Sequence, residues 1–421
     1  MAYPPIEPYE TGMLDTGDGN LVYWEACGNP DGLPVLIVHG GPGSGCTTGQ
    51  RRSFDPQRHR IILFDQRNCG RSRPHASDPA ADMRLNTTDH LIRDMERLRE
   101  HLGVGRWLLR GGSWGVTLSL AYAERHPERV SGMVLVSVTS TRRSELDWLY
   151  RGAGRMFPEA WARFRDFAGA GRYRLPTDAE PPIEDLLMAY SRLMEDRDPG
   201  VRAQAATEWL AWEDAVISME YNGQPGTYGS RPDDARLAFV RICSHYFAND
   251  GFLEDGVLIR EAGRLVGIPG VLVHGRGDLG GPVITAWELA RAWPGAELVV
   301  IEDSGHTGSS AMQEALYAAG DRVFATITGR QAAGSGHLPG CSSPDKQQIG
   351  HENDSNRGEV ATGWVQAGQA VGPSSRSAGN ASNRARAGHA RRRSPPAPPQ
   401  PSIVTTIRGQ RVCAGTKVSR L

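Results

Sequence analysis

Residues 108–127 read LLRGGSWGVTLSLAYAERHP, a short apolar run followed by glycines, a serine and a run with helical spacing. Ordered glycine costs backbone entropy, so glycines crowded around Ser113 indicate a backbone that needs them. The spacing of Gly111, Ser113 and Gly115 is typical of a sharp turn from a strand into a helix, which exposes the serine hydroxyl while the neighbouring backbone packs tightly. The stretch therefore predicts an α/β fold with Ser113 at the carboxyl end of a strand.

Strand-like and helix-like segments alternate on both sides of this turn. Apolar, β-branched runs predict strands at 21–28, 34–41, 60–70, 106–112, 129–138, 270–278 and 296–306. Helical spacing predicts helices at 87–103, 116–127, 285–293 and 310–327. Thr87 or Thr88 can cap the first of these helices, and Gly103 ends it. This alternation predicts a mostly parallel sheet.

The alternation stops over residues 142–256, where four segments rich in Trp, Arg and Glu read as helices and strand-like runs vanish. Because strands return after this segment, we expect a helical cap inserted into the sheet domain. The predicted organisation is a core in two parts, a cap and a tail, at 1–141, 257–328, 142–256 and 329–421 respectively.

The tail differs from the body in composition and charge. Residues 331–421 hold 12 Lys and Arg against 4 Asp and Glu, a net charge of +8, which leaves −9 for residues 1–330. The tail is rich in Gly, Ser, Pro and Arg, so it cannot bury enough apolar surface to offset its ordering entropy. We expect residues 329–421 to be disordered. The basic run 391–393 leaves open a contact with nucleic acid or a membrane, against a solvated extension without such a role.

Composition sets further limits on the class of protein. With 39% hydrophobic and 23% charged residues, the chain resembles an ordinary globular protein. No apolar run reaches the roughly 18 residues of a membrane-spanning helix, and the N-terminus lacks the pattern of a secretory signal. The cysteines are scattered without a CxxC pair, at positions 27, 46, 69, 243, 341 and 413. This usage predicts reduced thiols in the cytoplasm.

Three residues predict nucleophilic catalysis. A serine hydroxyl attacks a carbonyl only with a base beside it and a carboxylate that orients the base. Asp278 ends one predicted strand and His306 follows the next. The chain order Ser113, Asp278, His306 is typical of α/β hydrolases, and all three follow strand ends, where such sheets place their sites.

The transition state also needs donors for the oxyanion. The glycine-rich run HGGPGSG at 39–45 follows a predicted strand, and its backbone can lie beside the turn at Ser113. We expect the backbone N–H groups of Gly41 and Trp114 to form the oxyanion hole. His39 is expected to shape this loop rather than to take part in the chemistry.

The motifs together resemble one family closely. HGGPGSG, DQRNCGRSRPHAS, GGSWGVTLSLAYAERHPERV, HGRGD and SGH are similar to those of the proline iminopeptidases, or prolyl aminopeptidases. The resemblance covers roughly residues 1–328. It implies an α/β-hydrolase serine peptidase with a helical cap, which releases an N-terminal proline from peptides, needs no metal or cofactor and is cytoplasmic. It also implies that Ser113, Asp278 and His306 are the catalytic triad.

The family binds the substrate's free amino group with carboxylates of the cap. The resemblance of TEWLAWEDA places one of them at Glu213. In RICSHYF, Cys243 stands where the family has a second glutamate, and Phe247 matches an expected pocket aromatic. Losing one charged hydrogen bond costs roughly 1.5–3 kcal/mol. Asp250 and Glu254 are candidates to replace the missing carboxylate.

Other departures from the family affect the same region. Thr139 stands where an aromatic residue lines the proline pocket, Gly281 where a cysteine often follows the triad aspartate, and Asp89 where Trp is usual. The predicted substrate-binding residues are therefore Glu213, Phe247, Cys243 and Thr139.

Three alternatives stay open beside a proline iminopeptidase acting on small peptides with a free N-terminus. The first is an esterase or amidase for small neutral acyl substrates, and the second is a binding protein on a hydrolase fold. The third is a separate interaction role of the basic tail. We expect no need for nucleic acid or a membrane in the activity, and the sequence leaves the oligomeric state open.

Overall fold

The computed structural model describes residues 3–170, 181–220, 223, 225–334 and 403–406. Within them the sheet has nine strands in the order β1-β2-β4-β3-β5-β6-β7-β8-β9. The strands are β1 Glu10–Asp15, β2 Leu21–Gly28, β3 Leu33–Val38, β4 His59–Phe64, β5 Trp107–Gly112, β6 Val130–Val136, β7 Gly270–Gly275, β8 Ala296–Ile301 and β9 Ile403–Thr406. β2 pairs antiparallel with β1 and β4, and every other pair is parallel. The predicted, mostly parallel α/β fold is confirmed.

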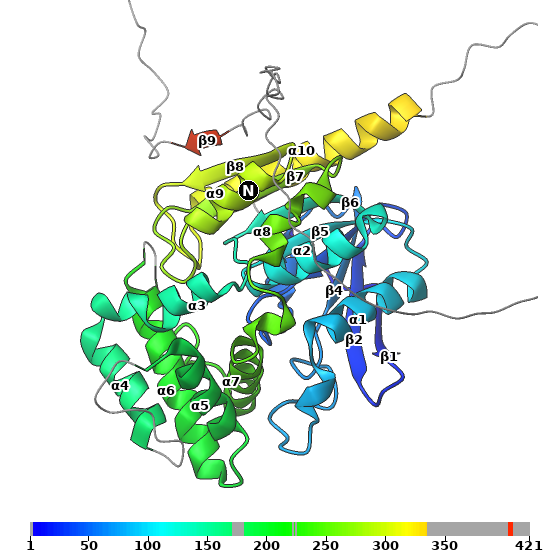
Figure 1. The fold of residues 1–421 in the computed structure, drawn as a ribbon. Coiled ribbons are helices and arrows are strands. Elements are labelled where there is room, and N and C mark those ends of the chain that lie inside the picture. The colour runs from blue at the N-terminus through cyan, green and yellow to red at the C-terminus, as the bar shows by residue number, and fades with distance from the viewer. Residues whose placement is uncertain (1–2, 171–180, 221–222, 224, 335–402, 407–421) are drawn as a thin grey trace, which may run out of the picture. The chain divides into compact units, whose positions relative to one another are not determined.

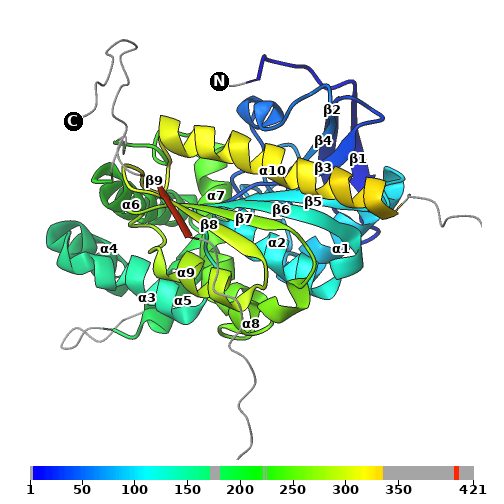
Figure 2. The ribbon, with the colours of Figure 1, turned by 90° about the horizontal axis from the view of Figure 1, so that it is seen from above.

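Helices cover both faces of the sheet (Figure 2). One face packs against α1 Thr88–His101, α2 Trp114–Arg125 and α9 Ile284–Ala292, and the other packs against α10 Ser310–Gly334. Neighbouring residues of one strand serve opposite faces: Leu109 joins the first cluster and Leu108 the second. Burial on both faces explains why the central strands read as continuous apolar runs.

Local signals account for the ends of these helices. The side chain of Thr87 accepts a hydrogen bond from the backbone N–H of His90, so it caps α1. Gly103 follows α1 with a φ of 64°, which glycine adopts without steric cost. α10 continues to Gly334, six residues past the predicted end of the body at 328.

The segment between β6 and β7 is helical, as expected, and forms the cap (Figure 1). Its main helices are α3 Arg143–Tyr150, α4 Pro158–Ala170, α5 Ile183–Met194, α6 Pro199–Ser218 and α7 Asp233–Phe247. They enclose an apolar cluster of their own, in which the ring centroids of Phe164 and Tyr190 lie 4.4 Å apart. A short helix, α8 Val257–Arg260, follows the cap. The boundaries at 142 and 256 stay predictions.

Little of the tail belongs to the described residues. Besides the end of α10, they include β9, which pairs with β8. The remainder of 329–421, with the basic run 391–393, lies outside them. No helix in the described part of the chain has the length and apolar character needed to cross a membrane.

Candidate active site

Ser113 sits on the turn between β5 and α2 with φ 54° and ψ −127°. A non-glycine residue in this region costs roughly 1–3 kcal/mol, which the surrounding packing must offset. That packing needs glycines: a Cβ on Gly115 would lie 2.1 Å from the carbonyl oxygen of Val38, and one on Gly111 would lie 2.5 Å from that of Gly115. The glycine spacing around Ser113 therefore serves close approach of α2 to the end of β3.

The structure brings Ser113, Asp278 and His306 together. Nε2 of His306 lies 2.9 Å from Oγ of Ser113, and Nδ1 lies 2.9 Å and 3.0 Å from the two carboxylate oxygens of Asp278. Asp278 follows β7 and His306 follows β8, so neighbouring parallel strands deliver both side chains to the sheet edge near Ser113. This is the hydrogen-bonded chain that activates a serine.

The charges of the acid and the base shift each other's pKa values in opposite directions. Burial alone would raise the pKa of Asp278, but His306 and the N–H group of Gly281, 2.6 Å away, keep that pKa below its ordinary value. Burial alone would lower the pKa of His306, but the Asp278 carboxylate raises it to about 9. Asp278 therefore stays ionised and stabilises the protonated imidazole, and His306 acts as the base in the fraction that is neutral.

A second histidine, His274, supports the acid, and the sequence analysis did not single it out. The N–H of Val138 donates to its Nδ1 at 2.9 Å, so the ring proton is on Nε2, which donates to the carbonyl oxygen of Gly281 at 2.9 Å. Burial lowers the pKa of His274, so the ring is neutral. His274 thus fixes the loop that carries Asp278.

The predicted oxyanion residues, Gly41 and Trp114, both border the hollow at Ser113. Gln66 ties their segments together. Its backbone N–H donates to Nε2 of His39 at 2.9 Å, and its side-chain amide donates to the His39 carbonyl at 2.8 Å and accepts from the indole N–H of Trp114 at 3.0 Å. His39 is placed as a loop-shaping residue, and Gln66 joins that loop to the turn at Ser113.

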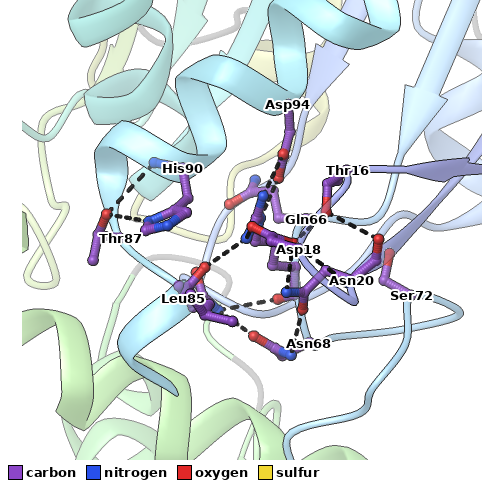
Figure 3. Close-up of polar contacts among 12 residues, drawn as sticks. Thr16, Asp18, Asn20, Gln66, Asn68, Ser72, Leu85, Thr87, His90 and Asp94 are labelled. Atoms are coloured by element: carbon purple, nitrogen blue, oxygen red, sulfur yellow. Dashed lines mark hydrogen bonds and ion pairs between the residues drawn. The ribbon is translucent and has the colours of Figure 1, made fainter. Parts of the chain in front are cut away.

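The loop after β4, which contains Gln66, is anchored by a buried polar network (Figure 3). Arg67 donates to both carboxylate oxygens of Asp94, at 2.5 Å and 2.7 Å, and to Asp18 at 2.7 Å. Asn68 accepts from the side chain of Asn86 at 3.0 Å. The motif DQRNCGRS is therefore a scaffold that fixes the glycine-rich loop, and its residues are placed to support the chemistry indirectly.

A hollow between Ser113 and the cap forms the inner pocket. Its walls include Ser113, His306 and Thr139 from the core and Tyr150, Glu213 and Phe247 from the cap. Three of the four predicted substrate-binding residues thus line it. Cys243 is not among the lining residues: it is buried, and its Sγ lies 3.2 Å from the carbonyl oxygen of Pro42.

Among the described residues, the hydrogen-bond donors to Glu213 all reach one of its two carboxylate oxygens. Oε1 accepts from the hydroxyl of Tyr150 at 2.6 Å and from the indole N–H of Trp209 at 2.7 Å. Oε2 receives no hydrogen bond from the described residues. Burial raises the pKa of Glu213, although both donors oppose that shift. A buried carboxylate with an unoccupied oxygen in a pocket suits a cationic ligand.

The candidates to replace the missing second carboxylate lie elsewhere. Asp250 pairs with Arg143 at 3.1 Å, and Glu254 pairs with Arg260 at 3.0 Å, both on the surface. Glu145 borders the inner pocket, but both of its oxygens already accept hydrogen bonds from the 140–141 loop.

The departures from the family at Gly281 and Thr139 are neighbours in the structure. A Cβ on Gly281 would lie 2.9 Å from Cγ2 of Thr139. Asp89 pairs with Arg125 at 2.5 Å on the surface.

Sequence reasoning missed Glu220, two residues past the end of α6. Its carboxylate accepts from the backbone N–H groups of Leu279 at 2.7 Å, Gly280 at 3.2 Å and His306 at 2.6 Å. Its partners lie 59 to 86 residues away in the chain. No local pattern could have identified it.

The chain is similar to known proteins over most of the body. A family model described as the alpha/beta hydrolase fold matches residues 34–309. A probable proline iminopeptidase of Streptomyces coelicolor is 48% identical over 325 residues, covering 76% of this chain and 97% of that protein. Proline iminopeptidases of Xylella fastidiosa and Arabidopsis thaliana are 44% and 41% identical over 309 residues each, covering 72% and 73% of this chain and 93% and 77% of those proteins. The chain therefore belongs to the proline iminopeptidase family of α/β hydrolases.

Proposed function

We propose that this protein is a serine aminopeptidase that releases an N-terminal proline, or another small N-terminal residue, from peptides. The observation that carries the proposal is the chain from Ser113 through His306 to Asp278 beside a pocket lined by Glu213, one oxygen of which has no donor among the described residues. The curated relatives bear the name proline iminopeptidase and are matched over most of their length. Peptides with a free N-terminus are the substrates that this combination favours.

The geometry supports the following reaction. His306 takes the proton of Ser113, whose oxygen attacks the carbonyl of the N-terminal residue while Asp278 orients the imidazole. The N–H groups of Gly41 and Trp114 stabilise the oxyanion. The protonated His306 gives its proton to the leaving amine, and water then releases the acyl group from Ser113 by the same steps.

Glu213 anchors the substrate's ammonium group in this proposal. Its Oε2 accepts from the ammonium, and the shared burial strengthens the attraction. The alternative is an esterase or amidase for small neutral acyl groups. That alternative is favoured by Cys243, which replaces the second family carboxylate and lies outside the pocket wall. The proposal also includes a cytoplasmic location, which the free thiols of Cys27, Cys46, Cys69 and Cys243 support.

A substrate panel separates the two functions. We expect prolyl-arylamide to be cleaved faster than alanyl-arylamide, and N-acetyl-prolyl-arylamide to resist cleavage because acetylation removes the ammonium that Glu213 binds. The measurement is kcat/KM for these arylamides beside a neutral aryl ester. Ester turnover without any preference for a free amine would favour the esterase and contradict the aminopeptidase.

A further inference from the structure

A second hollow, the outer groove, meets the inner pocket at the reacting serine. The two share Gly41, Ser113, Tyr228 and His306. A peptide whose scissile carbonyl contacts Ser113 therefore has its N-terminal residue on one side of the serine and its leaving residue on the other. Because Glu213 borders the inner pocket, the N-terminal residue belongs there and the leaving residue lies in the outer groove.

The two hollows differ in charge. The inner pocket is lined by two glutamates, Glu145 and Glu213, and by no lysine or arginine of the described residues. The outer groove is lined by Arg73 and Arg231, with Asp234 as its acidic residue. Since a short peptide carries an ammonium at one end and a carboxylate at the other, the pair of hollows matches its charge pattern.

Arg231 is the groove residue best prepared to bind an anion. Its guanidinium carbon lies 4.3 Å from the ring centroid of Phe239 and 5.2 Å from that of Tyr228, so the head group rests on two aromatic rings. Within the described residues, the guanidinium makes no hydrogen bond or ion pair. By contrast, Arg241 on α7, the helix that begins two residues after Arg231, has a bidentate pair with Glu195. A stacked guanidinium without an anion keeps its hydrogen-bonding edge for a carboxylate.

We propose that the outer groove binds the carboxylate of the leaving residue through Arg231, so that the preferred substrates are short zwitterionic peptides. This inference rests on the proposed aminopeptidase activity and names its substrate class. Arg73 adds positive charge to the groove. His75 adds none, because burial lowers the pKa of its ring and keeps it neutral.

The test compares each peptide with its own amide. We expect kcat/KM for Pro-Ala and other prolyl dipeptides to exceed that of the C-terminal amide by roughly tenfold or more, the effect of one charged hydrogen bond. Arg231→Met should remove this ratio, and Arg231→Lys should keep part of it. Prolyl-arylamide has no carboxylate, so its turnover should fall less than that of the peptide; any loss it shows acts through Glu213, whose pKa the Arg231 charge lowers. Arg236→Met is the matched control, because Arg236 lies five residues further along the chain, on α7, and does not line the groove.

The outcomes separate this inference from the proposed function. A protein that cleaves prolyl-arylamide but treats peptides and amides alike overturns the carboxylate site and leaves the aminopeptidase intact. An equal loss on arylamide and peptide in Arg231→Met also overturns the site. No turnover of any prolyl substrate overturns the proposed function itself.

A second inference concerns Glu220 and rests on different contacts. One buried carboxylate accepts backbone N–H groups from the loop that carries Asp278 and from His306. The fit is close, because a Cβ on Gly305 would lie 2.5 Å from Cβ of Glu220. The carboxylate lies beyond the end of α6, the cap helix that also bears Glu213.

We infer that Glu220 is a positioning residue. It fixes the loop that carries Asp278 relative to the loop that carries His306, and it stabilises the imidazolium of His306 in the transition state. Burial and the Asp278 charge raise the pKa of Glu220, whereas His306 and the backbone donors oppose that rise. In its ionised form Glu220 adds to the effect of Asp278, which raises the pKa of His306. Glu220 itself touches no substrate in this arrangement, because its oxygens face the backbone of the two loops.

The pH profile distinguishes this role from a purely structural one. In Glu220→Gln we expect kcat to fall roughly tenfold or more with little change in KM, because the loss of one charged contact acts on the transition state. Removing the charge lowers the pKa of His306, so the acid limb of kcat/KM moves to lower pH. Glu220→Asp, which keeps the charge, should keep the acid limb.

Glu208→Gln is the control for Glu220. Glu208 is a buried carboxylate like Glu220 but lies within α6, and it pairs with Arg163 away from the triad. A Glu220→Gln protein with normal kcat and an unmoved acid limb overturns the inference. A lower melting temperature with an unmoved acid limb marks Glu220 as structural only and overturns it as well.

Discussion

Replacing Ser113 with alanine should lower kcat for prolyl-arylamide by roughly 10⁴–10⁶-fold, the range found when a triad nucleophile is removed. In the proposed reaction, the hydroxyl 2.9 Å from His306 forms the acyl intermediate, and alanine offers no replacement. The fold should persist, because serine and alanine carry the same Cβ at a φ of 54°. The measurement is the steady-state kcat of the wild type and of Ser113→Ala, together with the melting temperature of both proteins.

Ser131→Ala is the matched control for this change. Ser131 lies on β6, and its buried hydroxyl has no hydrogen-bond partner in the described part of the chain. We expect normal turnover from this variant. Turnover by Ser113→Ala within tenfold of the wild type, from protein free of contaminating peptidase, would rule out Ser113 as the nucleophile.

Glu213→Gln should reduce kcat/KM for free-amine substrates by roughly 10²–10³-fold, because an ammonium in a buried pocket loses its counter-charge. Glutamine keeps the size of the side chain and an oxygen for the donors Tyr150 and Trp209. A neutral aryl ester carries no ammonium, so its turnover should change little. The ratio of the two kcat/KM values is the quantity to measure.

Glu208→Gln controls for the loss of a buried carboxylate on the same helix, and its ratio should match the wild type. If Glu213→Gln lowers ester and arylamide turnover equally, the residue supports the fold of the cap rather than the ammonium. The sign of the pH effect follows from burial, which raises the pKa of Glu213. Protonation of Glu213 at acidic pH removes the charge, so the preference for free amines should weaken as the pH falls.

The parts of the fold that could be predicted are those with a local cause. The central strands are buried on both faces, so each is an apolar run, and the turn at Ser113 needs glycines that stand out in the sequence. β1 was missed, because an edge strand that reads ETGMLD and is largely exposed carries no such run. Its antiparallel pairing with β2 depends on contacts across the sheet.

The site divides in the same way. The triad and the oxyanion loop could be proposed because each follows a strand end, and the chemistry requires those residue types. Glu220 could not be proposed, because its partners are distant in the chain. Arg231 could not be proposed either, because the rings on which it stacks come together only in the folded cap. The sequence analysis put Cys243 at the substrate because its family position implies that, whereas its side chain turns to Pro42.

The cap of this protein is not an exchangeable module. α6 bears Glu213, which faces the pocket, and leads into Glu220, which holds the backbone of both catalytic loops. Substrate choice and the alignment of the acid and base are thus encoded seven residues apart on one inserted segment. A chimera whose cap comes from a hydrolase without a carboxylate at the position of Glu220 would acquire a new specificity. It would also lose the hydrogen bonds that hold the loops of Asp278 and His306 together.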